Sequence, residues 1–268
     1  YNPMVAHKAM SLIWMMFGLA PAVAPFIVGW LHDAFGWHSV FYFLAIYSSL
    51  IFILILVRIP ETLPLTQRQS FHPPNVARVY SRTLTHRRFQ TLVFIVACYF
   101  GGMFLYVAGA PTLIFDFLHL QSNDFAVLFL PMVAGLMCGA WISGRLSHRW
   151  PAERTTGLAL VVLTLGTLLN SAQALWLPQS AITAVLPLVV YSEGIGMAMP
   201  SMTVLSLDCF PDNRGSASAM QGFIQMLGNA LIASIAVPLL SLQPAYMALG
   251  QTTLIAIACL LWMQRPAA

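Results

Sequence analysis

Charged residues are what this sequence most conspicuously lacks. Asp, Glu, Lys and Arg together make up 7% of its 268 residues, whereas a soluble globular domain typically has about 25%. Hydrophobic residues make up 59%, and the mean hydropathy is +0.79. A chain with so few charges cannot cover its surface in water. The composition therefore predicts a membrane-embedded protein and excludes a water-soluble domain.

Metal-binding and catalytic clusters are also absent. The four cysteines (98, 138, 209 and 259) share no metal-ligand spacing and lie within or beside apolar runs, as small buried side chains do. The seven histidines lie in predicted loops or at span ends, without a recurring acid–histidine cluster. We expect no cofactor, no metal and no enzymatic activity. The net charge of +4 comes from basic residues at the ends of apolar runs, which argues against nucleic acid as a partner.

Long apolar runs are what the sequence does contain. A membrane-spanning helix needs about 20 mostly apolar residues, and eight segments qualify. They are residues 9–30, 38–57, 90–115, 124–144, 155–176, 180–207, 217–240 and 245–263. The runs are continuously apolar rather than alternating, which favours helices over a membrane barrel.

The basic residues predict the orientation of these spans. All twelve Lys and Arg residues fall on alternate connections between the spans or at the two ends of the chain. The connections near 31–37, 116–123, 177–179 and 241–244 contain none. Because basic residues mark the cytoplasmic side, both ends of the chain are predicted to be cytoplasmic.

One connection, 58–89, is long, polar and basic, with four prolines. It divides the chain into residues 1–57, with two spans, and 90–268, with six. Six helices behind a long cytoplasmic linker is the arrangement of one half of a transporter built from two six-helix bundles. We therefore interpret 1–57 as the last two helices of a first bundle.

Four stretches carry recognisable motifs. GLAPAVAPFIVGW at 18–30 places Gly18, Pro21, Pro25 and Gly29 in an apolar helix, where proline kinks the helix and glycine permits close packing. GRLSHRWPAERT at 144–155 is a basic loop containing Gly144, Arg149 and Arg154. Residues 199–230 combine Asp208 and Arg214 in a loop with a run of small residues. Residues 101–120 contain paired glycines, a Tyr and an Ala-Pro.

These motifs resemble the last eight of twelve helices in a major facilitator superfamily transporter. The similarity is to the bicyclomycin/chloramphenicol resistance subgroup of drug:proton antiporters, with residues 18–30 similar to the fifth-helix antiporter signature. Ala24 and Val28 stand where that signature has glycine. The resemblance implies an all-α membrane protein of the bacterial inner membrane that exports drug-like molecules in exchange for protons, monomeric when full-length. Gly144, Arg149, Arg154, Asp208 and Arg214 would gate the cytoplasmic face; plain anchoring of the loop is the alternative.

Other functions remain open at this stage. A permease for uptake of a metabolite would share the fold, and a non-transporting fragment is a third possibility. In the family, the first four helices supply a principal proton-coupling acid and half of the substrate cavity. We therefore expect this chain alone to be impaired in transport. The substrate and the coupling stoichiometry do not follow from the sequence.

Glu193 is the one acid inside a predicted span; the other seven lie in loops or at span ends. A carboxyl group at that depth is expensive and normally faces a cavity, a partner or a proton path. Removal from water favours its neutral form, so Glu193 is a candidate proton carrier or cation site, with a hydrogen-bonded packing residue as the alternative. Further candidates for lining a mostly apolar cavity are Tyr99, Met103, Tyr106, Asn170, Gln225 and Asn229.

Overall fold

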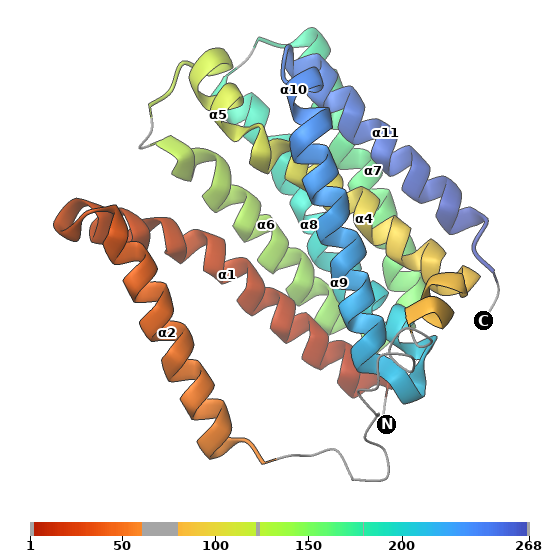
Figure 1. The fold of residues 1–268 in the computed structure, drawn as a ribbon. Coiled ribbons are helices and arrows are strands. Elements are labelled where there is room, and N and C mark those ends of the chain that lie inside the picture. The colour runs from red at the N-terminus through yellow and green to blue at the C-terminus, as the bar shows by residue number, and fades with distance from the viewer. Residues whose placement is uncertain (1–2, 61–79, 122–123, 179, 267–268) are drawn as a thin grey trace.

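The computed structural model describes residues 3–60, 80–121, 124–178 and 180–266. Every regular element within these ranges is helical (Figure 1). Seven stretches of them are long and apolar enough to cross a membrane. These are α2 (Trp37–Arg58), α4 (Arg87–Ala108), α6 (Phe125–Leu146), α7 (Ala152–Trp176), α8 (Ala181–Asp208), the compound stretch Pro211–Leu240, and α11 (Pro244–Met263).

These seven stretches match seven of the predicted spans. The eighth prediction, residues 9–30, falls in α1 (Pro3–Phe35), a helix of 33 residues. Several of its side chains, including those of Pro21 and Pro25, lie outside the described part of the chain, and so does any contact made by Gly18. The kink expected at Pro25 therefore stays a prediction. Most of the predicted linker 58–89 also lies outside the described residues.

Two of the predicted spans are not single continuous α-helices. The expected span 90–115 is interrupted: α4 ends at Ala108, and α5 (Ala110–Thr112) and a π-helix, η2 (Leu113–Phe117), follow. Pro111 has no N–H to donate, so the α-helical hydrogen-bond ladder cannot continue through it. In the compound stretch, a 3₁₀ turn, η4 (Pro211–Asn213), precedes α9 (Arg214–Leu231), which passes into the π-helix η5 (Ile232–Ala236) ahead of Pro238 and α10 (Val237–Leu240).

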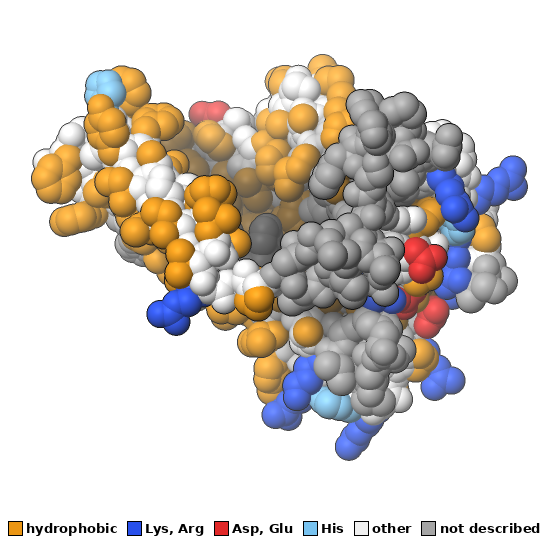
Figure 2. Space-filling model, turned by 60° about the horizontal axis from the view of Figure 1, so that its bottom comes forward, with side chains coloured by type: hydrophobic (Ala, Val, Ile, Leu, Met, Phe, Trp, Pro, Cys, Tyr) orange, Lys and Arg blue, Asp and Glu red, His pale blue; other side chains and the backbone are white. Residues whose placement is uncertain are grey.

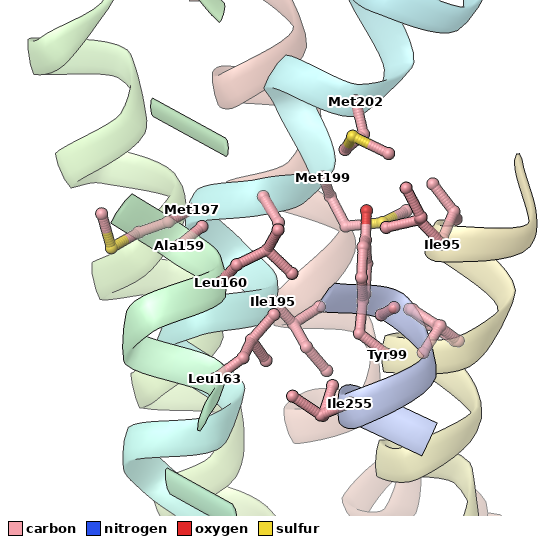
Figure 3. Close-up of a cluster of buried hydrophobic side chains, with 14 of the residues drawn as sticks. Ile95, Tyr99, Ala159, Leu160, Leu163, Ile195, Met197, Met199, Met202 and Ile255 are labelled. Atoms are coloured by element: carbon pink, nitrogen blue, oxygen red, sulfur yellow. The ribbon is translucent and has the colours of Figure 1, made fainter. Parts of the chain in front are cut away.

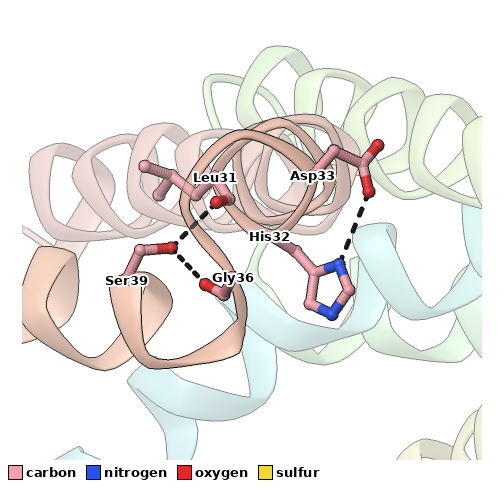
Figure 4. A network of polar contacts seen from close by, with 5 residues as sticks. All are labelled: Leu31, His32, Asp33, Gly36 and Ser39. Carbon is pink, nitrogen blue, oxygen red and sulfur yellow. Dashed lines mark hydrogen bonds and ion pairs between the residues drawn. The ribbon is translucent and has the colours of Figure 1, made fainter.

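The predicted turn at 31–37 is also much shorter than expected, because α1 continues to Phe35 and α2 begins at Trp37 (Figure 4). The one residue between them, Gly36, has φ +79°, a left-handed conformation that favours glycine. The Ser39 hydroxyl donates to the carbonyl oxygens of Leu31 at 2.9 Å and Gly36 at 2.6 Å. These bonds satisfy carbonyl groups at the end of α1, so the chain reverses direction within a single residue.

Helix α8 lies at the centre of the bundle. It packs against α6 on one side and α7 on the other, and α1 lies along α6 and α8. A Cβ atom added at Gly139 of α6 would overlap the carbonyl oxygen of Glu193, and one added at Gly166 of α7 would lie 2.8 Å from the backbone nitrogen of Tyr191. The three backbones therefore touch, as small residues allow in membrane helices.

The largest buried cluster joins α4, α7, α8 and α11, with Leu136 from α6 (Figure 3). Tyr99 of α4 projects into it, and its hydroxyl points toward Met199 of α8. Around the ring lie Ile95, Leu163, Ile195 and other aliphatic side chains. By contrast, α2 packs against α1 and has no buried residue. An apolar helix with this exposure presents its surface to lipid or to further helices.

Candidate functional site

Glu193 lies near the middle of α8 and is half-buried. In the seven membrane-length stretches that the structure describes, every other charged residue lies within four residues of an end. Its carboxyl group has no hydrogen bond or ion pair to any residue in the described ranges. Its own backbone faces Gly139, so the close contact between α6 and α8 fixes this turn of the helix.

A polar network crosses the bundle beside the main cluster. The Asn170 side-chain amide donates to the Tyr106 hydroxyl at 2.6 Å and to Gln251 Oε1 at 2.8 Å. Gln251 Nε2 donates in turn to the backbone carbonyl of Gly102 at 3.3 Å. Asn170 and Gln251 are 2% and 0% exposed, so the network is buried, and it links α4, α7 and α11.

This network changes how two of the candidates are understood. Tyr106 and Asn170, expected beside a cavity, direct their polar atoms toward each other and toward Gln251. Gln251 itself was missed from the sequence, although a lone Gln inside the last apolar span was the available signal. Tyr191, also missed, donates its hydroxyl hydrogen to the Tyr99 carbonyl at 2.5 Å.

The remaining cavity candidates lie on α4 and α9. Tyr99 is fully buried, and its hydroxyl has no hydrogen-bond partner among the described residues. Met103 is half-buried between the two larger clusters. Gln225 and Asn229 are 7% and 3% exposed on α9, so both amides point into the bundle. The structure thus places these candidates in the interior, on two neighbouring helices.

The basic motif residues gather at one end of the molecule, where Lys and Arg side chains surround the face in Figure 2. The predicted pair forms here, with Arg214 Nη2 3.0 Å from Asp208 Oδ1. Arg149 and Arg154 are exposed and make no ion pair with the described residues. Gly144 faces Ser11 of α1, with a contact of 3.2 Å for an added Cβ.

A second ion pair at this end was missed: Arg88 Nη2 lies 3.8 Å from Glu153 Oε1, linking the first turns of α4 and α7. Both residues line a cleft of about 540 Å³ together with His86, Asp208 and Cys209. Burial raises the pKa of the Cys209 thiol above its ordinary value; the Arg88 charge lowers it and the Asp208 charge raises it. The cleft is therefore a charged region at the end of the bundle.

The antiporter-like stretch of α1 is helical throughout. Gly29 is exposed, and nothing lies within 4 Å of a Cβ added there. Within the described ranges, no group of three or more His, Cys, Asp or Glu side chains is placed to hold a metal ion.

Comparison with known proteins gives consistent matches. Residues 6–233 match the Major Facilitator Superfamily. The chain is 28% identical over 237 residues to an uncharacterized MFS-type transporter, YdgK, of Bacillus subtilis, covering 85% of this chain and 57% of the relative. It is 25% identical over 237 residues to a bicyclomycin resistance protein homolog of Haemophilus influenzae, with the same coverage. Multidrug resistance protein D of Escherichia coli is 23% identical over 268 residues, covering 98% of this chain and 65% of that protein.

The fold also matches a solved structure. The crystal structure of the transporter FucP in the outward conformation aligns with a TM-score of 0.67 and 12% sequence identity, over 100% of this chain and 72% of that one. The chain thus spans little more than half the length of the first two relatives above.

Proposed function

Because the chain belongs to the major facilitator superfamily, a family of transporters rather than enzymes, we propose that it acts in proton-coupled export of drug-like amphipathic molecules across a bacterial inner membrane. The support comes from relatives named for bicyclomycin and multidrug resistance. The chain covers 57% of the length of YdgK and of the bicyclomycin resistance protein homolog. The activity of the whole transporter is therefore part of the proposal.

Residues 1–57 would be the last two helices of a first bundle, 58–89 the cytoplasmic linker, and 90–268 the second, six-helix bundle. Both chain ends would be cytoplasmic. The gathering of Lys and Arg side chains on one face supports this orientation, because basic residues concentrate on the cytoplasmic side of membrane proteins (Figure 2). The Asp208–Arg214 pair would then lie at the cytoplasmic ends of α8 and α9.

The observation that carries the proposal is the unpaired carboxyl group of Glu193. Ionisable residues inside a membrane normally pair with one another or face a substrate or proton path. Glu193 has no such pair among the described residues. Its free carboxyl group would bind a proton in its neutral form and hold a cationic substrate in its ionised form. Export of the cation would then be coupled to uptake of a proton.

The test is binding of a lipophilic cation, tetraphenylphosphonium, to the purified chain. Loss of one charge contact predicts that Glu193→Gln weakens binding about tenfold, equivalent to about 1.4 kcal/mol. Glu153→Gln is the matched control, because Glu153 lies at a helix end and pairs with Arg88. Cation binding should also release a proton, measured by titration calorimetry in buffers of different ionisation enthalpy.

Equal affinity of Glu193→Gln and the unchanged chain would remove Glu193 from the mechanism. Weaker binding without proton release would retain the cation site and overturn the proton coupling.

A further inference from the structure

The innermost line of α9 consists of amide side chains. Gln221, Gln225 and Asn229 follow one another at intervals of four residues, which places them on one face of the helix. They are 6%, 7% and 3% exposed. All three therefore point inward over more than two turns of a helix that belongs to a membrane-length stretch.

The opposite face of α9 is apolar and open. Phe223 is 60% exposed, Met226 59% and Leu227 47%. The inner face packs against α4, where a Cβ added at Gly228 would lie 3.7 Å from Ala97, and against α8 (Figure 1). The helix is amphipathic with its polar side inside, the reverse of a surface helix in a soluble protein.

Two of the three amide oxygens on this line are buried without a partner among the described residues. Gln221 Oε1 and Asn229 Oδ1 are buried and form no hydrogen bond with any of the described residues. A buried polar atom without a partner is unfavourable, and in native structures such atoms are commonly bound to ordered water. One such atom could be tolerated as a local defect, but two on the same face, with a third amide between them, form a repeated pattern.

The spacing of the three amides suits a file of water molecules. Four residues of α-helix rise about 6 Å, a gap that one or two hydrogen-bonded waters bridge between neighbouring amides. Each water needs two to four polar partners, which the amides and adjacent waters would provide. The line begins seven residues beyond Arg214, whose side chain is 31% exposed beside Asp208 at the charged end of the bundle.

We propose that the inner face of α9 holds a water file that enters from the Arg214 end and extends past Gln221 and Gln225 to Asn229. The file brings water into the helical bundle at the depth of the buried aromatic and methionine side chains. It requires only the α4–α8–α9 packing, so it exists whether or not the chain exports drugs.

Cysteine accessibility tests the proposal in the chain reconstituted into liposomes. The four native cysteines are replaced by Ala, and a single Cys is placed at Gln225 or, as the matched control, at Met226 on the exposed apolar side of the same turn. A charged, water-soluble methanethiosulfonate reagent reacts with the thiolate form, which needs water. We expect Gln225→Cys to react about tenfold faster than Met226→Cys. Equal labelling rates of the two single-Cys variants would overturn the proposed water file.

A second measurement tests continuity. In a chain carrying Asn229→Cys, adding Gln221→Leu should slow labelling at residue 229 about tenfold, because an apolar side chain interrupts the hydrogen-bonded waters. The control Phe223→Leu should leave that rate unchanged. Unchanged labelling with Gln221→Leu would overturn entry from the Arg214 end. Gln221→Cys repeats the first comparison at an independent position, and SDS-unfolded protein gives the rate of a fully accessible thiol.

Discussion

The hydroxyl group of Tyr191 on α8 donates a hydrogen bond to the backbone carbonyl of Tyr99 on α4, over 2.5 Å. One turn further along α4, Gln251 of α11 donates to the carbonyl of Gly102. Two side chains from different helices thus bond to the backbone of α4 on either side of Gly101. Donors of this kind satisfy carbonyl groups that lose their helical partners when a membrane helix bends. Both bonds tie α4 to neighbouring helices at the glycine pair.

The two tyrosines should respond oppositely to loss of their hydroxyl groups. Tyr191→Phe removes the donor to Tyr99 and should lower the free energy of unfolding by about 1 kcal/mol. Tyr99→Phe removes a buried hydroxyl without a partner among the described residues and should be neutral or stabilising. Equilibrium unfolding of the purified chain in mixed micelles measures both. A destabilised Tyr99→Phe would show that its hydroxyl has a partner.

Gly139→Ala should disrupt the contact between α6 and α8. The added Cβ would overlap the backbone carbonyl of Glu193, and because backbone cannot move aside like a side chain, we expect a loss of about 1–3 kcal/mol in unfolding free energy. Gly222→Ala on α9 is the control, since nothing lies within 4 Å of its added Cβ. That variant should be neutral or slightly stabilised in the same unfolding experiment. Equal stability of the two variants would contradict direct contact of the backbones.

Asn170 and Gln251 should be energetically coupled. Replacing either with Leu leaves polar atoms of the network unpaired, whereas the double variant removes both amides. A double-mutant cycle on unfolding free energy should therefore give a coupling of about 0.5–2 kcal/mol. Asn170→Leu with Thr253→Ala is the control cycle, because Thr253 bonds within its own helix. Additivity in the first cycle would contradict the network.

Labelling of Cys209 should require a higher pH than labelling of a free thiol, because burial raises its pKa and only the thiolate reacts. Arg88→Gln removes a charge that lowers this pKa, so labelling by iodoacetamide at a fixed mildly alkaline pH should become slower. Asp208→Asn removes a charge that raises it, so labelling should become faster. The rates are measured with Cys98, Cys138 and Cys259 replaced by Ala. If both variants changed the labelling rate of Cys209 in the same direction, the result would contradict the placement of Arg88 and Asp208 beside this thiol.

Much of the fold could be predicted from the sequence, because membrane spans depend on length and hydropathy, which are local properties. Five predicted spans agree with the membrane-length stretches within three residues at both ends, and two more overlap them with one displaced end. The errors lie where backbone hydrogen bonding decides the outcome. One π-helical turn follows Pro111 and another precedes Pro238. The left-handed Gly36 takes the place of a whole predicted loop. Hydropathy is insensitive to these features.

The candidate site was less predictable because the sequence does not show which way a polar side chain points. Asn170 and Gln225 are similar residues in similar apolar runs. The structure places Asn170 in a buried network with two partners and Gln225 on the inner line of α9. The pair Asp208–Arg214 could be foreseen because six residues separate its members, whereas Arg88 and Glu153 are 65 positions apart and depend on the packing of two helices.

The hydrogen bonds of Gln251 have a consequence for the order in which the protein assembles in the membrane. Helices α6, α7 and α8 are consecutive and touch through their backbones, so they can dock soon after they leave the ribosome. The carbonyl of Gly102 and the amide of Asn170, which also bonds to Tyr106, gain a further bond to Gln251, which is synthesised 149 residues after Gly102. A nascent chain arrested before α11 would therefore keep the bond from Tyr191 of α8 to α4 but lack the link from α4 and α7 to the last helix.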